Sequence, residues 1–150
     1  MSEVLPSDAL AATLHSAGKR VTTPRLAVYA AVAAHGHLDA EAIGRAVRDE
    51  LGSVSTQTVY DALGVLCELD LLRRIEPAHS PALYEARVAD NHHHVVCRHC
   101  GAVADVDCAV GEAPCLDPST THGFVVDEAE VTYWGLCPAC QTTPGGAAAP

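Results

Sequence analysis

The sequence contains few large apolar side chains and almost no lysine. Its 150 residues include one Phe, one Trp, one Met and a single Lys, although 49% of the residues are apolar. The core must therefore be built from Ala, Val and Leu, so a small domain would need extra stabilisation from a metal ion or a partner subunit. No apolar run approaches the ~18 residues of a membrane-spanning helix, so we expect no membrane partner.

Positive charge is also scarce. The formal net charge is −10, which argues against a protein that binds nucleic acid through bulk charge alone. The distribution is uneven, because residues 1–85 carry seven of the nine basic residues and a net charge of −4, whereas residues 86–150 carry −6. A local basic face in the first part can still bind DNA, with specific contacts supplying more of the affinity.

Cysteine is plentiful by contrast. Four of the seven cysteines form two CxxC pairs, Cys97 with Cys100 and Cys137 with Cys140. Four thiolates from two such turns are the ligand set of a closed, tetrahedral structural zinc site. Two disulfides are the alternative. The absence of a secretory signal leads us to expect a protein of the reducing cytoplasm, which favours zinc.

Helix-capping residues organise the first half of the chain. Ser7 or Asp8, Thr22 or Thr23, Asp39 and Ser55 each precede an apolar periodic segment, which predicts four helices. We expect these helices to end near residues 17, 35, 51 and 69. Two short strands, 71–76 and 83–87, follow with a turn-rich connection. This order predicts a winged helix-turn-helix domain over residues 1–87.

The second half has a different character. Strands are predicted over residues 92–97, 102–107, 122–127 and 129–136, and the glycine and prolines of residues 109–121 predict irregular structure there. Residues 88–141 would form a second domain, and the Gly/Ala/Pro-rich residues 142–150 a disordered tail. The fold class expected for the whole chain is α+β.

The fourth predicted helix begins with side chains that reach phosphates and base edges. They are Ser55, Thr56, Gln57, Thr58 and Tyr60. The same composition is also common on helix ends that are simply solvated, so by itself it is a weak indication of DNA recognition.

Three consecutive histidines precede the first CxxC pair. On a strand, His92 and His94 would share one face and His93 would point to the other. Two imidazoles at this spacing can grip a transition metal, although a polar strand end is the simpler alternative. Glu85, Asp105 and His37 are further candidate ligands, each of which could instead be an ordinary exposed polar residue.

These residues together resemble the ferric uptake regulator family of metal-dependent transcriptional repressors. The similarity is carried by six segments: 20–25, 37–41, 55–60, 84–85, 91–101 and 134–140. It implies an N-terminal winged-helix domain, a C-terminal α/β dimerisation domain, and a homodimer on a palindromic operator. It also implies that Tyr60 is the main base-contacting residue, and we expect Arg25 to contact DNA as well.

The resemblance also implies two metal sites. Structural zinc is assigned to Cys97, Cys100, Cys137 and Cys140. A regulatory metal is assigned to His37, Glu85, His92, His94 and Asp105. Nitrogen and oxygen ligands suit Fe(II) or Mn(II), for which Zn(II) or Ni(II) would compete by intrinsic affinity. A further metal site that the family has is not expected here, because Ala129 occupies the position of a histidine that this site takes from the final strand. His93 and Glu112 could still bind an ion weakly.

Segments 105–108, 127–130 and 133–135 resemble the branch associated with control of catalase-peroxidase genes. This resemblance predicts a repressor that peroxide releases by oxidising His37 or His92. A disulfide between Cys108 and Cys115 is the rival switch, and an iron- or zinc-sensing uptake repressor is the alternative function. An enzyme with a small-molecule substrate is not expected, because zinc would occupy all the paired cysteines and the chain has no Gly-rich phosphate loop or nucleophile elbow.

Overall fold

The computed structural model describes residues 4–86, 88, 92–107, 118–126 and 130–142. The chain divides into two compact units, residues 1–90 and 91–150. Each unit has its own sheet, and the described residues include four helices in the first unit and one in the second, as the α+β class predicts. No helix in the described part of the chain is both long and apolar enough to cross a bilayer.

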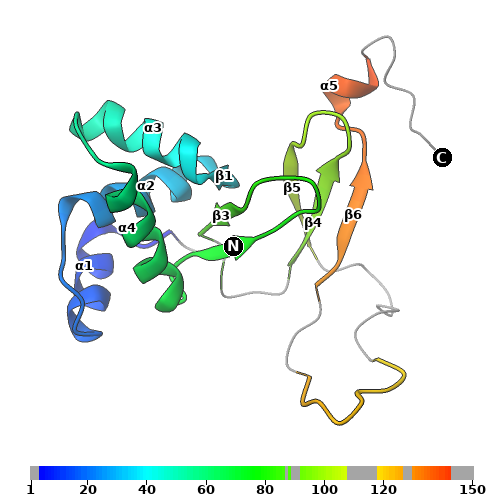
Figure 1. Ribbon diagram of the computed structural model, residues 1–150, viewed down its shortest axis with the longest axis horizontal. Coiled ribbons are helices and arrows are strands. Elements are labelled where there is room, and N and C mark those ends of the chain that lie inside the picture. Colours follow the sequence, from blue (N-terminus) through cyan, green and yellow to red (C-terminus); the bar gives the residue numbers. More distant parts are fainter. Residues whose placement is uncertain (1–3, 87, 89–91, 108–117, 127–129, 143–150) are drawn as a thin grey trace. The chain divides into compact units, whose positions relative to one another are not determined.

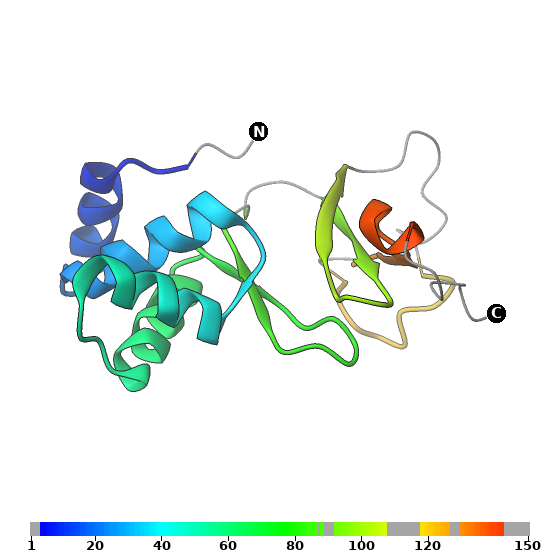
Figure 2. The same cartoon turned by 90° about the horizontal axis from the view of Figure 1, so that it is seen from above.

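The first unit contains four helices and a three-stranded antiparallel sheet (Figure 1). The helices are α1 (Ser7–Ser16), α2 (Thr23–His35), α3 (Ala40–Leu51) and α4 (Thr56–Glu68). The strands are β1 (Leu38–Asp39), β2 (Arg73–Ile75) and β3 (Leu83–Glu85), in the order β1-β3-β2. Figure 2 shows the helices and this sheet from above. The arrangement is a winged helix-turn-helix.

Three predicted caps set where the helices of the first unit begin. Thr22 accepts a hydrogen bond from the amide of Arg25, and Asp39 accepts one from the amide of Ala42 at 2.7 Å. Ser55 accepts from the amide of Thr58 at 3.0 Å. Each cap satisfies an amide that the first helical turn leaves without an intrahelical partner.

Aliphatic side chains from all four helices form the core of the first unit. Val28 and Val32 of α2 meet Ile43 of α3 and Leu63 and Leu66 of α4, and all are at most 1% exposed. Burial of side chains of this size stabilises the fold by roughly 1.5–3 kcal/mol each before entropy is counted. The core therefore holds α3 and α4 in a fixed relation, which matters for any surface that both helices share.

Over residues 92–107, 118–126 and 130–142, the second unit contains a three-stranded mixed sheet followed by one turn of helix. The strands are β4 (His92–Cys97), β5 (Val103–Asp107) and β6 (Thr132–Gly135), and α5 spans Pro138–Gln141. Strand β4 lies in the middle, antiparallel to β5 and parallel to β6 (Figure 1). Among the described residues of this unit, the buried apolar side chains are Val96, Cys97 and Cys140. Such a small apolar core agrees with the expected need for metal.

Two predicted strands differ from the structure for local reasons. The amides of Leu71 and Leu72 both donate to the carbonyl of Leu66, so these residues close the end of α4 and the strand begins later. The predicted strand 122–127 is wrong over 122–126: His122 and Gly123 have positive φ angles of 49° and 84°, which turn the chain. The strand predicted from residue 129 starts at Thr132 in the described residues, and β1 and α5 were not predicted.

Candidate functional site

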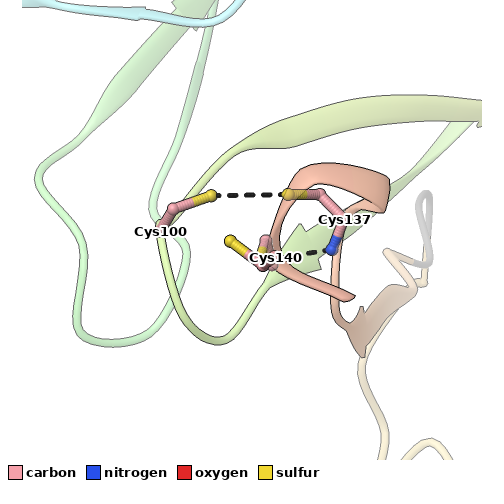
Figure 3. A group of neighbouring side chains, drawn as sticks. Cys100, Cys137 and Cys140 are labelled. Carbon is pink, nitrogen blue, oxygen red and sulfur yellow. Dashed lines mark hydrogen bonds between the residues drawn. The ribbon is translucent and has the colours of Figure 1, made fainter. Parts of the chain in front are cut away.

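The four paired cysteines lie together in the second unit. Cys97 ends β4, Cys100 follows in the turn, and Cys137 and Cys140 belong to the start of α5. Their sulfur atoms all lie within 4.8 Å of one another, and those of Cys100 and Cys137 are 3.7 Å apart (Figure 3). A tetrahedral zinc with ~2.3 Å bonds to sulfur separates its ligands by about 3.8 Å. The cluster therefore fits a structural zinc, and all four cysteines are free thiols, not disulfides.

The thiols of this cluster differ in acidity. Backbone amides of Cys100 and Cys137 point at the sulfur of Cys97, the latter at 3.3 Å, and lower its pKa to about 6. Hydrogen bonding to the sulfur of Cys137, together with burial, raises the pKa of Cys140 to about 12. The fold thus favours the thiolate form of Cys97 before a metal binds, whereas a metal must displace the proton of Cys140.

Strands β4 and β5 bring three further candidate ligands together in the second unit. His92 and His94 share one face of β4, with ring centroids 4.8 Å apart. The Nε2 atom of each lies 3.8 Å from Oδ1 of Asp105, which stands opposite His94 in the β4–β5 register. Both imidazoles are nearly fully buried. Two ring nitrogens directed at one carboxylate oxygen form a nitrogen/oxygen donor set that suits a divalent transition metal.

His93 occupies the other face of β4, as strand alternation predicts. Its ring makes an edge contact with Tyr133 of β6, with the centroids 6.4 Å apart. Its predicted companion Glu112 lies outside the described residues, as do Ala129, Cys108 and Cys115. A carboxylate that the sequence did not single out lies beside His94 instead: Oε1 of Glu130 is 3.9 Å from its Nδ1.

The remaining two predicted ligands meet within the first unit. Leu38 of β1 pairs with Tyr84 of β3, which brings the residues that flank them, His37 and Glu85, side by side. Nε2 of His37 lies 2.9 Å from Oε2 of Glu85. Glu85 is only 2% exposed, and a buried carboxylate requires a hydrogen-bonding or cationic partner. Each unit therefore carries its own group of nitrogen and oxygen donors.

The predicted DNA contacts surround the start of α4. Tyr60 is 51% exposed, whereas the hydroxyl of Ser55 caps the helix and lies 2.8 Å from that of Thr58. Gln57 donates to Asp61 one turn later at 2.7 Å. Arg25, at the start of α2, donates to the backbone carbonyl of Arg20. Within this set, Tyr60 offers the largest side chain exposed to solvent.

A winged helix-turn-helix unit and a unit built around a four-thiolate cluster define this molecule as a metal-binding transcriptional regulator. Comparison with known proteins gives the family. Residues 16–134 match the model of the ferric uptake regulator family. The chain belongs to this family, which confirms the predicted metal-dependent repressor and excludes the enzyme.

Individual relatives support the same family assignment. Transcriptional regulator FurA of Mycobacterium tuberculosis is 61% identical over 127 residues, which cover 85% of this chain and 86% of FurA. Ferric uptake regulation protein 2 of Mycolicibacterium fortuitum is 54% identical over 134 residues, covering 87% and 92% of the two chains. The ferric uptake regulator structure of Helicobacter pylori has the same fold, with a TM-score of 0.72 at 20% identity over 95% of this chain and 99% of that one.

Proposed function

We propose that this regulator is a metal-gated repressor that binds palindromic operator DNA as a homodimer and is released by peroxide. Residues 1–87 would read DNA through Tyr60, Arg25 and the start of α4, and residues 88–141 would pair the two protomers. The proposal depends mainly on one observation: each unit holds a group of nitrogen and oxygen donors that can bind a divalent metal. His37 and Glu85 meet in the DNA-binding unit, and His92, His94 and Asp105 meet in the other.

An ion that takes ligands from both halves would restrict the arrangements open to the two units. The restricted arrangement would set the spacing of the two recognition helices in the dimer, so metal and DNA would each strengthen binding of the other. Couplings of this kind are typically about 1–3 kcal/mol, or about 5–150-fold in affinity. Fe(II) and Mn(II) suit the donor set best, and Zn(II) and Ni(II) would compete in vitro.

The sensing chemistry follows from the ligands. Bound Fe(II) supplies one-electron chemistry with peroxide, and His37 and His92 are the imidazoles that we expect to gain an oxygen atom. An oxidised imidazole is a poorer ligand, so the ion and then the operator would be released. The resemblance of segments 105–108, 127–130 and 133–135 to the catalase-peroxidase branch supports catalase-peroxidase genes as targets. This chemistry requires the reducing cytoplasm, where free thiols persist.

A titration tests whether metal binding controls operator binding. A duplex is first isolated from a random-sequence library with Mn(II)-loaded, zinc-replete protein; we refer to it as the selected operator. Its affinity is then measured against Mn(II), Fe(II) and Zn(II) concentration for the wild type, His92→Ala and His93→Ala. His92→Ala should abolish the metal dependence, whereas His93→Ala, one residue away on the opposite face, should retain it. Equal loss in both variants would contradict the assignment of the site.

Peroxide treatment tests the signal. The Fe(II) protein should lose the selected operator, and peptides containing His37 or His92 should gain about 16 Da for one oxygen atom. The Mn(II) protein serves as the control and should be unaffected. A loss of about 2 Da that links Cys108 to Cys115 would instead identify the thiol switch. Full operator affinity with unchanged peptides would favour an iron- or zinc-sensing repressor.

A further inference from the structure

Helices α3 and α4 enclose a shallow hollow next to Tyr60. Its volume is about 100 Å³, and it is lined from α3 by Ala40, Glu41, Gly44 and Arg48 and from α4 by Thr56, Val59 and Tyr60. The buried side chains of Ile43, Val47 and Val59 hold the two helices together beneath it. The hollow is thus a rigid part of the surface that carries the start of the recognition helix.

Arg48 reaches into this hollow because residue 44 has no side chain. A Cβ atom at Gly44 would lie 3.1 Å from Nη1, 3.2 Å from Nη2 and 3.5 Å from Cζ of Arg48, so the guanidinium occupies the space beside residue 44 that a side chain would approach. Helical side chains lean toward the N-terminus of their helix, and residues i and i+4 share a face. The guanidinium is therefore directed back along α3, toward the first turn of α4. It points away from the C-terminal carbonyl groups of α3, with which a basic residue in the last turn of a helix often interacts.

The charge of Arg48 is not paired within residues 4–86, which form the described part of the first unit apart from residue 88. Lys19, Arg45 and Arg74 each form an ion pair with a glutamate. Glu41, the acidic residue at the hollow, directs its carboxylate to Arg45 at 2.7 Å. Arg48 has neither an ion pair nor a side-chain hydrogen bond among the described residues. A half-buried guanidinium held in one place without an anion is prepared to bind one.

We propose that Arg48 binds a phosphate of the DNA backbone beside the base pair that Tyr60 contacts. This inference rests on the proposed role of Tyr60 and the start of α4 in reading the operator. A planar guanidinium can donate two parallel N–H···O hydrogen bonds to the oxygens of one phosphate, and such contacts fix the register of a protein on the duplex. Because the net charge of the first unit is negative, a single guanidinium in a fixed position contributes more to orienting the protein on the DNA than to its general electrostatic attraction to DNA.

Salt dependence distinguishes a phosphate contact from other roles. Log affinity for the selected operator is measured against log salt concentration for Mn(II)-loaded wild type, Arg48→Gln, Arg48→Lys and Arg45→Gln. Arg48→Gln should weaken binding on the order of tenfold and make the slope shallower by about 0.9 per bound protomer. Arg45→Gln removes the same charge from the same helix and should leave the slope nearly unchanged. Arg48→Lys should keep the slope, because an ammonium also binds phosphate.

Gly44→Ala provides a test that leaves Arg48 in the sequence. The new Cβ would require the guanidinium to move by a few tenths of an ångström, and the three atoms nearest to that Cβ all belong to the Arg48 side chain. The melting temperature should stay equal or rise, because alanine favours helix over glycine, while operator affinity should fall. Unchanged affinity would show that the position of the guanidinium is irrelevant and would overturn the proposal.

The other outcomes are equally decisive. If Arg48→Gln and Arg45→Gln changed operator affinity and salt slope equally, Arg48 would contribute only its charge and not a specific phosphate contact, which would overturn the proposal. An unchanged salt slope with altered preference at one base pair would make it a base contact and overturn the phosphate assignment. If the Mn(II)-loaded wild type selects no operator, the proposed function fails first; if the wild type binds and Arg48→Gln matches it, only the inference about Arg48 fails.

Discussion

His94 of β4 stands directly opposite Asp105 of β5, and its Nε2 atom lies 3.8 Å from Oδ1 of that aspartate. The pairing is fixed by the register of the two strands, so it does not depend on a flexible loop. Strand alternation places His92 on the same face, at the same distance from the same oxygen atom. This half of the proposed regulatory site is therefore held rigidly by backbone hydrogen bonds.

Replacing Asp105 should weaken binding of the regulatory metal without affecting binding of the structural zinc. Asp105→Ala removes the carboxylate oxygen that lies 3.8 Å from both Nε2 atoms, so Mn(II) affinity should fall by at least about tenfold. Zinc held by the four cysteines should be unaffected. Calorimetric titration with Mn(II) and zinc content by mass spectrometry measure the two effects. Asp105→Glu keeps the carboxylate and should retain much of the affinity; loss of zinc in either variant would contradict the separation of the sites.

The zinc cluster should be required for folding of the second unit. Cys140→Ala removes one thiolate, and the described part of this unit has little buried apolar surface to compensate. Structural zinc supplies roughly 10–16 kcal/mol of apparent binding free energy in small domains, so its loss should leave residues 91–150 open to proteolysis. The helices of the first unit should persist, as measured by circular dichroism. Cys67→Ala, which changes a cysteine outside the cluster, should behave as the wild type.

Short-range chemistry was predictable from the sequence. Capping by Thr22, Asp39 and Ser55 depends on residues three positions apart, and the alternation of His92 to His94 depends only on strand geometry. The CxxC spacing likewise identified the thiol cluster, because each pair spans a single turn.

Features that depend on distant partners were not predictable. Strand β1 is two residues long and exists only because β3 pairs with it. Leu71 and Leu72 resemble a strand in composition, yet their amides are used by the carbonyl of Leu66. The spacing of Gly44 and Arg48 can be read from the sequence, but its meaning depends on the position of α4.

Zinc binding should release fewer protons than four free thiols would. Below neutral pH most cysteine thiols are protonated, but the pKa of Cys97 is lowered to about 6, so it is already a thiolate at pH 7. The slope of log apparent zinc affinity against pH should therefore be about one unit smaller above pH 6 than below it, where Cys97 must also lose a proton. Competition with a zinc chelator on both sides of this pH measures the slope. A slope that did not change across pH 6 would show that the metal-free cluster does not lower the pKa of Cys97.

Ser55 should act as a helix cap more than as a contact to bases. Its hydroxyl already accepts the amide of Thr58, so Ser55→Ala should cost about 1 kcal/mol of stability. Aspartate is an equally good cap, so Ser55→Asp should preserve the denaturant midpoint. Its carboxylate would, however, face the phosphates that approach the start of α4, and affinity for the selected operator should fall because of like-charge repulsion. Unfolding and operator binding measured on both variants separate the roles: if Ser55→Ala kept full stability but lost sequence preference, the hydroxyl would be a base contact and the cap would be incidental.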